Sequence, residues 1–283
     1  MNHQKNKVQT YTVTVLCLCL LAVLMRTVSY LFFFDTDPGY FKISPLPIIT
    51  NVLCVLTVLW ALTPLVLIPK DTLTKAEVPT VAAPTVPLLC VAALVITAVA
   101  FLISYVRTPA VTKLVVSATA LLSVPFFVTP SKAGSTNDAS GRTGLRLLSS
   151  YILIIFFAAL LVHTYIDYYV PMNSPFKTSL HFALLSAMLG ILQSARRLIG
   201  GDKIAPRADF VSMLLGTFLT GIFSLPTLVA LAAGKFARTD YLLYALVTFA
   251  FFLFFLARLI PLTSVLSGAD APATPEEARG GEH

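Results

Sequence analysis

The sequence predicts an all-α fold, a polytopic bundle of about eight transmembrane helices, and two observations lead to it. Apolar residues make up 57% of the 283 residues and charged residues only 12%, against roughly 45–50% and about 25% in soluble domains. The apolar residues also gather in long runs separated by short polar joints. A helix of about 20 residues, rising about 1.5 Å per residue, spans a hydrocarbon layer about 30 Å thick. The chain is therefore expected to be one membrane unit without a soluble domain.

Eight apolar runs are long enough to span the layer. They cover residues 10–34, 44–69, 84–106, 110–129, 145–166, 178–195, 208–233 and 240–262. Between the fourth and fifth runs, residues 130–144 are rich in Ser, Gly, Thr and Asn, and the end of the chain is rich in Ala, Pro, Gly and Glu. Such segments bury too little apolar surface to order themselves. The predicted organisation is therefore a four-helix half (1–129), a cytoplasmic linker (130–144), a second four-helix half (145–266) and a disordered cytoplasmic tail (267–283).

The distribution of basic residues predicts the orientation. The joints on the N-terminal side carry most of the Lys and Arg, among them Lys5, Arg142 and Arg279, whereas the opposite joints carry few. Cytoplasmic joints of membrane proteins carry the excess of Lys and Arg, so both termini are expected in the cytoplasm, with the chain in the cell membrane. The net charge of +7 forms no basic run or aromatic-basic pattern, and this argues against a nucleic-acid partner.

The sequence lacks the common motifs of catalytic and metal-binding sites. Cys17, Cys19, Cys54 and Cys90 lie within apolar runs, where a thiol behaves as a small hydrophobe, so we expect no disulfide, metal site or cofactor. The chain lacks a zinc-binding H-E-x-x-H pair, a phosphate-binding loop, a nucleophile elbow and a C-x-x-C pair. No nucleophile and base stand at a convincing spacing, and we therefore expect that the protein is not an enzyme. No carboxylate falls near the middle of a span, which argues against a carrier driven by protons or sodium ions.

Two loops resemble each other across the halves. Residues 41–44 read Phe-Lys-Ile-Ser and residues 176–179 read Phe-Lys-Thr-Ser, each at the mouth of the following span. Four helices per half would give a parallel internal repeat, although chance similarity between short loops is an equal alternative. Asp-Pro-Gly-Tyr at residues 37–40 and Pro-Met-Asn-Ser-Pro-Phe-Lys at 171–177 resemble an uncharacterised membrane-protein family of anaerobic clostridia. That resemblance implies a bacterial cytoplasmic membrane and nothing about chemistry.

A few polar residues stand out at similar depth toward the outer side of the spans. The candidate ligand-binding residues are Arg26, Tyr30, Asn51, His163, Asp167 and His181. One interpretation is an outward-facing pocket for an anionic or zwitterionic ligand. The other, which we favour from the sequence, is a structural ion pair between Arg26 and Asp167, with the histidines hydrogen-bonded at helix interfaces. A lone guanidinium at that depth would cost several kcal/mol, and so a carboxylate partner is expected, with Asp35 and Asp37 as alternatives.

Two further features concern helix packing and the membrane surface. Small residues recur on one face of the sixth span at Ser179, Ala183, Ser186, Gly190 and Ser194. Such a face lets two helices approach closely, either within the chain or in a homodimer. Arg258, near the cytoplasmic end of the last span, is expected to extend its guanidinium into the lipid headgroups.

These patterns support two functional hypotheses. The first is a small permease or permease-like subunit, and it rests on the apparent repeat and on the outer polar residues. The alternative is a non-catalytic scaffold or regulatory protein that acts through helix–helix contacts with another membrane protein or a second copy. In both cases the lipid bilayer is the expected surrounding.

Overall fold

The computed structural model describes residues 2–35, 39–67, 85–129, 139–167, 174–200, 206–236 and 239–267. Its helices are α1 (Asn2–Val28), η1 (Ser29–Phe33), α2 (Pro45–Leu62), α3 (Pro64–Leu67), α4 (Thr85–Arg107), α5 (Val111–Ser123), α6 (Pro125–Val128), α7 (Ala139–Ile166), α8 (Pro175–Gly200), α9 (Pro206–Ala232) and α10 (Thr239–Ser267). Within the described residues, eight helical segments are long and apolar enough to cross a membrane. The predicted all-α membrane bundle is therefore confirmed, including the number of spans.

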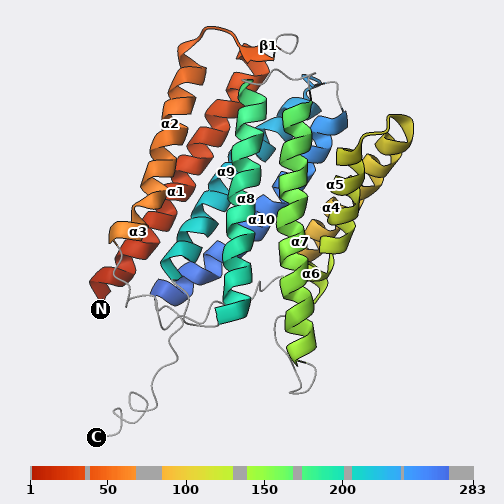
Figure 1. Ribbon diagram of the computed structural model, residues 1–283. Helices are drawn as coiled ribbons and strands as arrows, with labels where there is room; N and C mark the ends of the chain where they lie inside the picture. Colours follow the sequence, from red (N-terminus) through yellow and green to blue (C-terminus); the bar gives the residue numbers. More distant parts are fainter. Residues whose placement is uncertain are drawn as a thin grey trace, which may run out of the picture.

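The last four spans form the centre of the bundle and the first four flank it (Figure 1). α9 packs against both α8 and α10 and is the most buried span. α1 packs against α9 and carries α2 on its other side, while α4 and α5 pack against α10 and α7. The first four spans thus lie as two helical hairpins against different helices of the centre. The predicted division into halves and the predicted repeat stay predictions.

Two spans are interrupted by proline at corresponding places. Thr63 separates α2 from α3 just before Pro64, and Val124 separates α5 from α6 just before Pro125. Proline has no N–H to continue the helical ladder and its ring clashes with the preceding turn. The Arg207 Nη1 group donates a hydrogen bond of 3.0 Å to the carbonyl oxygen of Leu65, and this contact ties the interrupted helix to α9.

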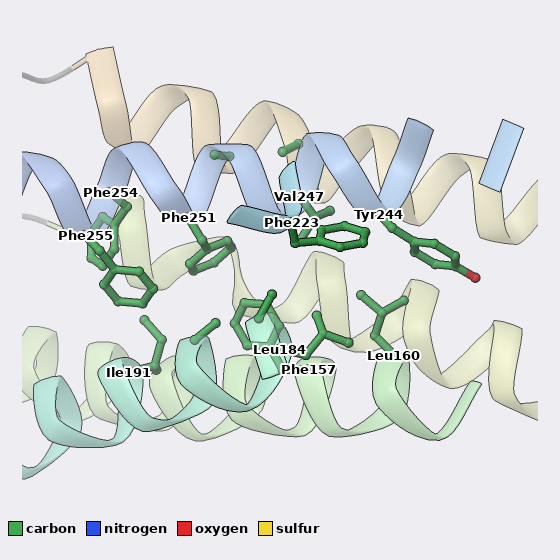
Figure 2. Close-up of a cluster of buried hydrophobic side chains, with 14 of the residues drawn as sticks. Phe157, Leu160, Leu184, Ile191, Phe223, Tyr244, Val247, Phe251, Phe254 and Phe255 are labelled. Carbon is green, nitrogen blue, oxygen red and sulfur yellow. The ribbon is translucent and has the colours of Figure 1, made fainter. Parts of the chain in front are cut away.

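The core is built from aromatic rings packed against one another and against aliphatic side chains (Figure 2). Phe251 and Phe157 meet at 4.7 Å between ring centroids in a nearly perpendicular arrangement. The ring of Phe255 lies between Gly190 of α8 and Gly216 of α9, where a Cβ on either glycine would come within 2.7 Å of the ring. A ring held this closely requires glycine on both helices.

The small residues predicted on one helix face are all buried inside the bundle. They are Ser179, Ala183, Ser186, Gly190 and Ser194. Of the two alternatives left open by the sequence, the structure therefore favours packing within the chain over packing in a dimer.

One end of the bundle is marked by a short two-stranded sheet. The π-helical turn η1 leads into β1 (Phe34–Asp35), which pairs antiparallel with β2 (Tyr40–Phe41), so that Phe34 is opposite Phe41. We call this the hairpin end; α8 begins at the same end, and α1 begins at the opposite end (Figure 1).

One predicted boundary differs, and a second predicted segment lies outside the described residues. α7 begins at Ala139, so helix extends into the predicted linker at 130–144 and the linker is shorter on that side. Residues 268–283, which make up nearly all of the predicted tail, lie outside the described residues.

Candidate functional site

A cavity of about 330 Å³ lies at the hairpin end between α1, α2, α8 and α9, and we call it the Arg26 cavity. Its polar lining is Arg26, Asn51, Cys54, Thr178 and Ser179, and its remaining lining is Val55, Pro175, Phe182, Leu219 and Ile222. No acidic residue is among these lining residues. Two of the predicted ligand-binding residues, Arg26 and Asn51, therefore line one cavity, and its only formally charged side chain is cationic.

Arg26 is buried, and no carboxylate among the described residues pairs with it. Its side chain is only 6% exposed, and Nε and Nη1 have no hydrogen-bond partner among the described residues. The guanidinium lies over two aromatic rings instead, 5.4 Å from the centroid of Phe41 and 6.0 Å from that of Tyr30. Aromatic faces attract a cation by about 0.5–2 kcal/mol, and this offsets only part of the cost of a charge at that depth.

Tyr30 stands beside this arginine in the π-helical turn. Its side chain is 1% exposed, its hydroxyl approaches Ser179, and no described group completes a hydrogen bond to that hydroxyl. Ser179 itself donates to the carbonyl oxygen of Pro175 at 2.6 Å. Single π-helical turns are frequent at functional sites, and here the turn begins three residues after Arg26.

His163 and Asp167 line a different cavity of about 260 Å³, which α4, α5, α7 and α10 surround. We call it the His163 cavity. The Nδ1 atom of His163 is 3.1 Å from the hydroxyl of Thr112, and the edge of its ring meets Phe101 at 5.0 Å between centroids. Lys113 and Asp240 also line this cavity.

His181 lies in neither cavity lining. Its Nε2 atom is 3.1 Å from the hydroxyl of Thr164 on α7, so this histidine joins α7 to α8. Nearby, Lys177 donates hydrogen bonds to the carbonyl oxygens of Tyr165 at 2.9 Å and of Asp167 at 3.1 Å. The interpretation that the histidines are hydrogen-bonded at helix interfaces is confirmed for both of them.

The expected ion pair between Arg26 and Asp167 is wrong. These two side chains form no ion pair, and they line separate cavities that share no lining residue. The prediction relied on similar depth along the membrane normal, which does not fix the lateral position of a helix. Asp37, one of the alternative partners, lies outside the described residues. The six predicted residues thus divide into Arg26 with Tyr30 and Asn51, His163 with Asp167, and His181 alone.

A charged cluster at the opposite end was not predicted from the sequence. Asp209 on α9 is 1% exposed and forms an ion pair with Arg197 on α8, with 2.6 Å between Oδ2 of Asp209 and Nη2 of Arg197. Arg258 on α10 donates a hydrogen bond to Ser194 on α8 and lies over the ring of Phe254 at 5.5 Å. The expectation that Arg258 extends into the headgroups is therefore wrong, because its guanidinium hydrogen-bonds to Ser194, a buried residue of α8. The only sequence signal was an acid in the first turn of a span.

The described part of the chain contains no disulfide and no cluster of metal-binding side chains. The four cysteines are free thiols, and no group of three or more His, Cys, Asp or Glu among the described residues could hold a metal ion.

Comparison with known proteins gave no relative from which a function could be carried over. No family model matches the chain, and neither a curated protein nor a solved structure matches it. The resemblance of its loops to a clostridial membrane family stays a prediction.

Proposed function

We propose that this integral membrane protein binds an anionic ligand in the Arg26 cavity and handles it in the manner of a small permease or permease-like subunit. The observation that carries the proposal is the Arg26 guanidinium, which is buried, lacks a carboxylate partner among the described residues and lines a cavity of about 330 Å³.

The energetics favour an anion. A buried cation is stabilised when a counter-charge and hydrogen-bond acceptors reach it, and a guanidinium matches the two oxygens of a carboxylate or a phosphate with parallel N–H donors. The cation–π contacts hold the group in place while leaving Nε and Nη1 unsatisfied. Asn51 and Thr178 add neutral donors to the same lining.

The location fits a binding role better than a scaffold role. The small-residue face of α8, which suggested helix–helix contacts with a partner, packs inside the chain, with Gly190 against Phe255. If both termini are cytoplasmic, as the basic residues predict, the hairpin end and its cavity face the outside of a bacterial cell. The proposed role is non-enzymatic, because the cavity supplies a charge and amide and hydroxyl donors with no histidine in its lining.

Ligand-induced thermal stabilisation tests this function. Purified protein in neutral detergent is titrated with three probes, namely inorganic phosphate, sn-glycerol 3-phosphate and phosphatidylglycerol, and its unfolding temperature is recorded. We expect at least one probe to raise the unfolding temperature of the wild type and of Arg107→Gln, and to raise that of Arg26→Gln much less at the same concentration. Arg107 is the matched control because it is an exposed arginine that ends α4 at the hairpin end and lines neither cavity. Equal responses of the Arg26 and Arg107 variants to every probe would reject an anion site at Arg26.

A further inference from the structure

The shape and polarity of the Arg26 cavity identify the chemical class of its ligand. We infer that the cavity binds a phospholipid, which enters sideways from the bilayer between α2 and α8, with its phosphate at Arg26 and an acyl chain along the apolar part of the groove. This inference rests on the proposed anion site and narrows it to an amphiphile.

The cavity opens to the side of the bundle. α2 packs mainly on α1, and α8 packs mainly on α9 and α7, so no described helix covers the face between α2 and α8. Val55 on α2 and Phe182 on α8 line the cavity and are 59% and 55% exposed. Within membrane-spanning helices, exposed apolar side chains face lipid. A ligand can therefore reach Arg26 from the lipid phase without crossing the bundle.

The lining changes from polar to apolar with depth. On α2, Asn51 precedes Val55 as the chain leaves the hairpin end, and on α8, Thr178 precedes Phe182. Leu219 and Ile222 of α9 complete the deeper part. A soluble anion would leave this deeper apolar part without a contact, whereas a lipid places a charged group and a hydrocarbon chain in that order.

The depth of the arginine suits a lipid headgroup. Arg26 lies seven residues before Phe33, the last residue of its span, which corresponds to about 10 Å at about 1.5 Å per residue. A long guanidinium stem at that depth reaches toward the interface, where lipid phosphates lie. Because Nε and Nη1 lack partners in the part of the chain that the structure describes, the phosphate oxygens would satisfy these two donors.

Three probes and two sets of variants separate this inference from the proposed function. Full-length protein in neutral detergent receives dioleoyl-phosphatidylglycerol, dioleoylglycerol (the same chains without phosphate) or sn-glycerol 3-phosphate (phosphate without chains). We expect only phosphatidylglycerol to raise the unfolding temperature at low concentration. Its apparent Kd should weaken about tenfold to a hundredfold in Arg26→Gln, as expected for the loss of charge-assisted hydrogen bonds, and remain unchanged in Arg107→Gln.

A second variant tests the groove without touching the charge. Val55→Trp fills the apolar part from a lipid-exposed position, and Val52→Trp is its control, because Val52 is 54% exposed on the same helix but does not line the cavity. We expect phosphatidylglycerol binding to weaken at least about tenfold in Val55→Trp only. These two variants also keep the test valid if Arg26→Gln fails to fold.

Each remaining outcome overturns the inference in a distinguishable way. Stabilisation by glycerol 3-phosphate at concentrations similar to the lipid, lost in Arg26→Gln, would mean that the ligand is a soluble anion and would leave the proposed function intact. Equal lipid stabilisation in all four variants would mean annular contact only. No Arg26-dependent response to any probe would reject both the inference and the proposed function.

Discussion

The guanidinium of Arg26 lies over the ring of Phe41, 5.4 Å from its centroid, and this contact joins the first span to β2. Phe41 in turn stacks on Tyr30 at 5.5 Å between centroids. β2, paired with β1, thus places Phe41 over the end of α1, where no described carboxylate neutralises the arginine. The loop that the sequence marked for its Phe-Lys-x-Ser motif positions the candidate site through its aromatic residue.

Replacing Phe41 with leucine tests this arrangement. Phe41→Leu keeps most of the apolar volume but removes the aromatic face, and so we expect a loss of about 1–2 kcal/mol of stability from the cation–π contact and the ring stacking. The measurement is the free energy of unfolding in detergent. Tyr40→Leu is the control, because Tyr40 is the neighbouring strand residue and is 41% exposed. A loss for Tyr40→Leu as large as that for Phe41→Leu would show that any change in this strand has the effect.

Arg26 and Asp167 should behave as independent sites. They line separate cavities and form no ion pair with each other, and changes at sites without shared partners usually add within about 0.3–0.5 kcal/mol. The loss in free energy of unfolding of the double variant should therefore equal the sum of the losses of Arg26→Gln and Asp167→Asn. A coupling energy above about 1 kcal/mol would contradict this and support the ion pair that was expected from the sequence.

Gly190 should not tolerate a methyl group. A Cβ there would lie 2.7 Å from Cζ of Phe255, and the ring cannot retreat because Gly216 borders its other side. We expect Gly190→Ala to lower stability by about 1–3 kcal/mol, as overpacked cores do, and Phe255→Leu to restore part of that loss in the double variant. Gly144→Ala is the control, since nothing lies within 4 Å of its added Cβ in α7; there alanine should be neutral or stabilising by up to about 1 kcal/mol.

The ion pair at the opposite end should be structural. Asp209→Asn leaves Arg197 without the buried carboxylate that it pairs with. Removing one member of a buried pair costs about 3–5 kcal/mol. Arg197→Met combined with Asp209→Asn should recover part of this loss in unfolding measurements. If the double variant were less stable than Asp209→Asn by the full effect of Arg197→Met, the two residues would not be coupled.

The orientation can be measured by cysteine labelling. In a background free of the four native cysteines, Ile43→Cys lies in a fully exposed position at the hairpin end. We expect it to react with an impermeant thiol reagent added to intact cells, and Lys203→Cys to react only after permeabilisation, because basic joints stay cytoplasmic. Labelling of Lys203→Cys in intact cells would invert the topology and place the Arg26 cavity toward the cytoplasm.

The sequence by itself determined the fold class and the number of spans. Apolar runs of sufficient length must be helical in lipid, because every backbone N–H and C=O has to be satisfied within the segment. The sequence also indicated that Arg26 is exceptional, since a cation at that depth always needs an explanation. The small residues of the sixth span predicted close helix packing, and the ring of Phe255 does lie directly against Gly190.

Only the tertiary structure decided which polar residues meet. Depth along the membrane normal can be counted from the sequence, but lateral neighbours depend on how the helices pack, and side-chain packing rather than apolar burial selects that arrangement in lipid. Arg26 was therefore expected to pair with Asp167, whereas α1 packs on α9 and places the arginine beside α2 and α8, while α7 places Asp167 beside α4, α5 and α10. For the same reason the inward hydrogen bond from Arg258 to Ser194 could not be read from the sequence, because the two residues lie on different helices that only packing brings together.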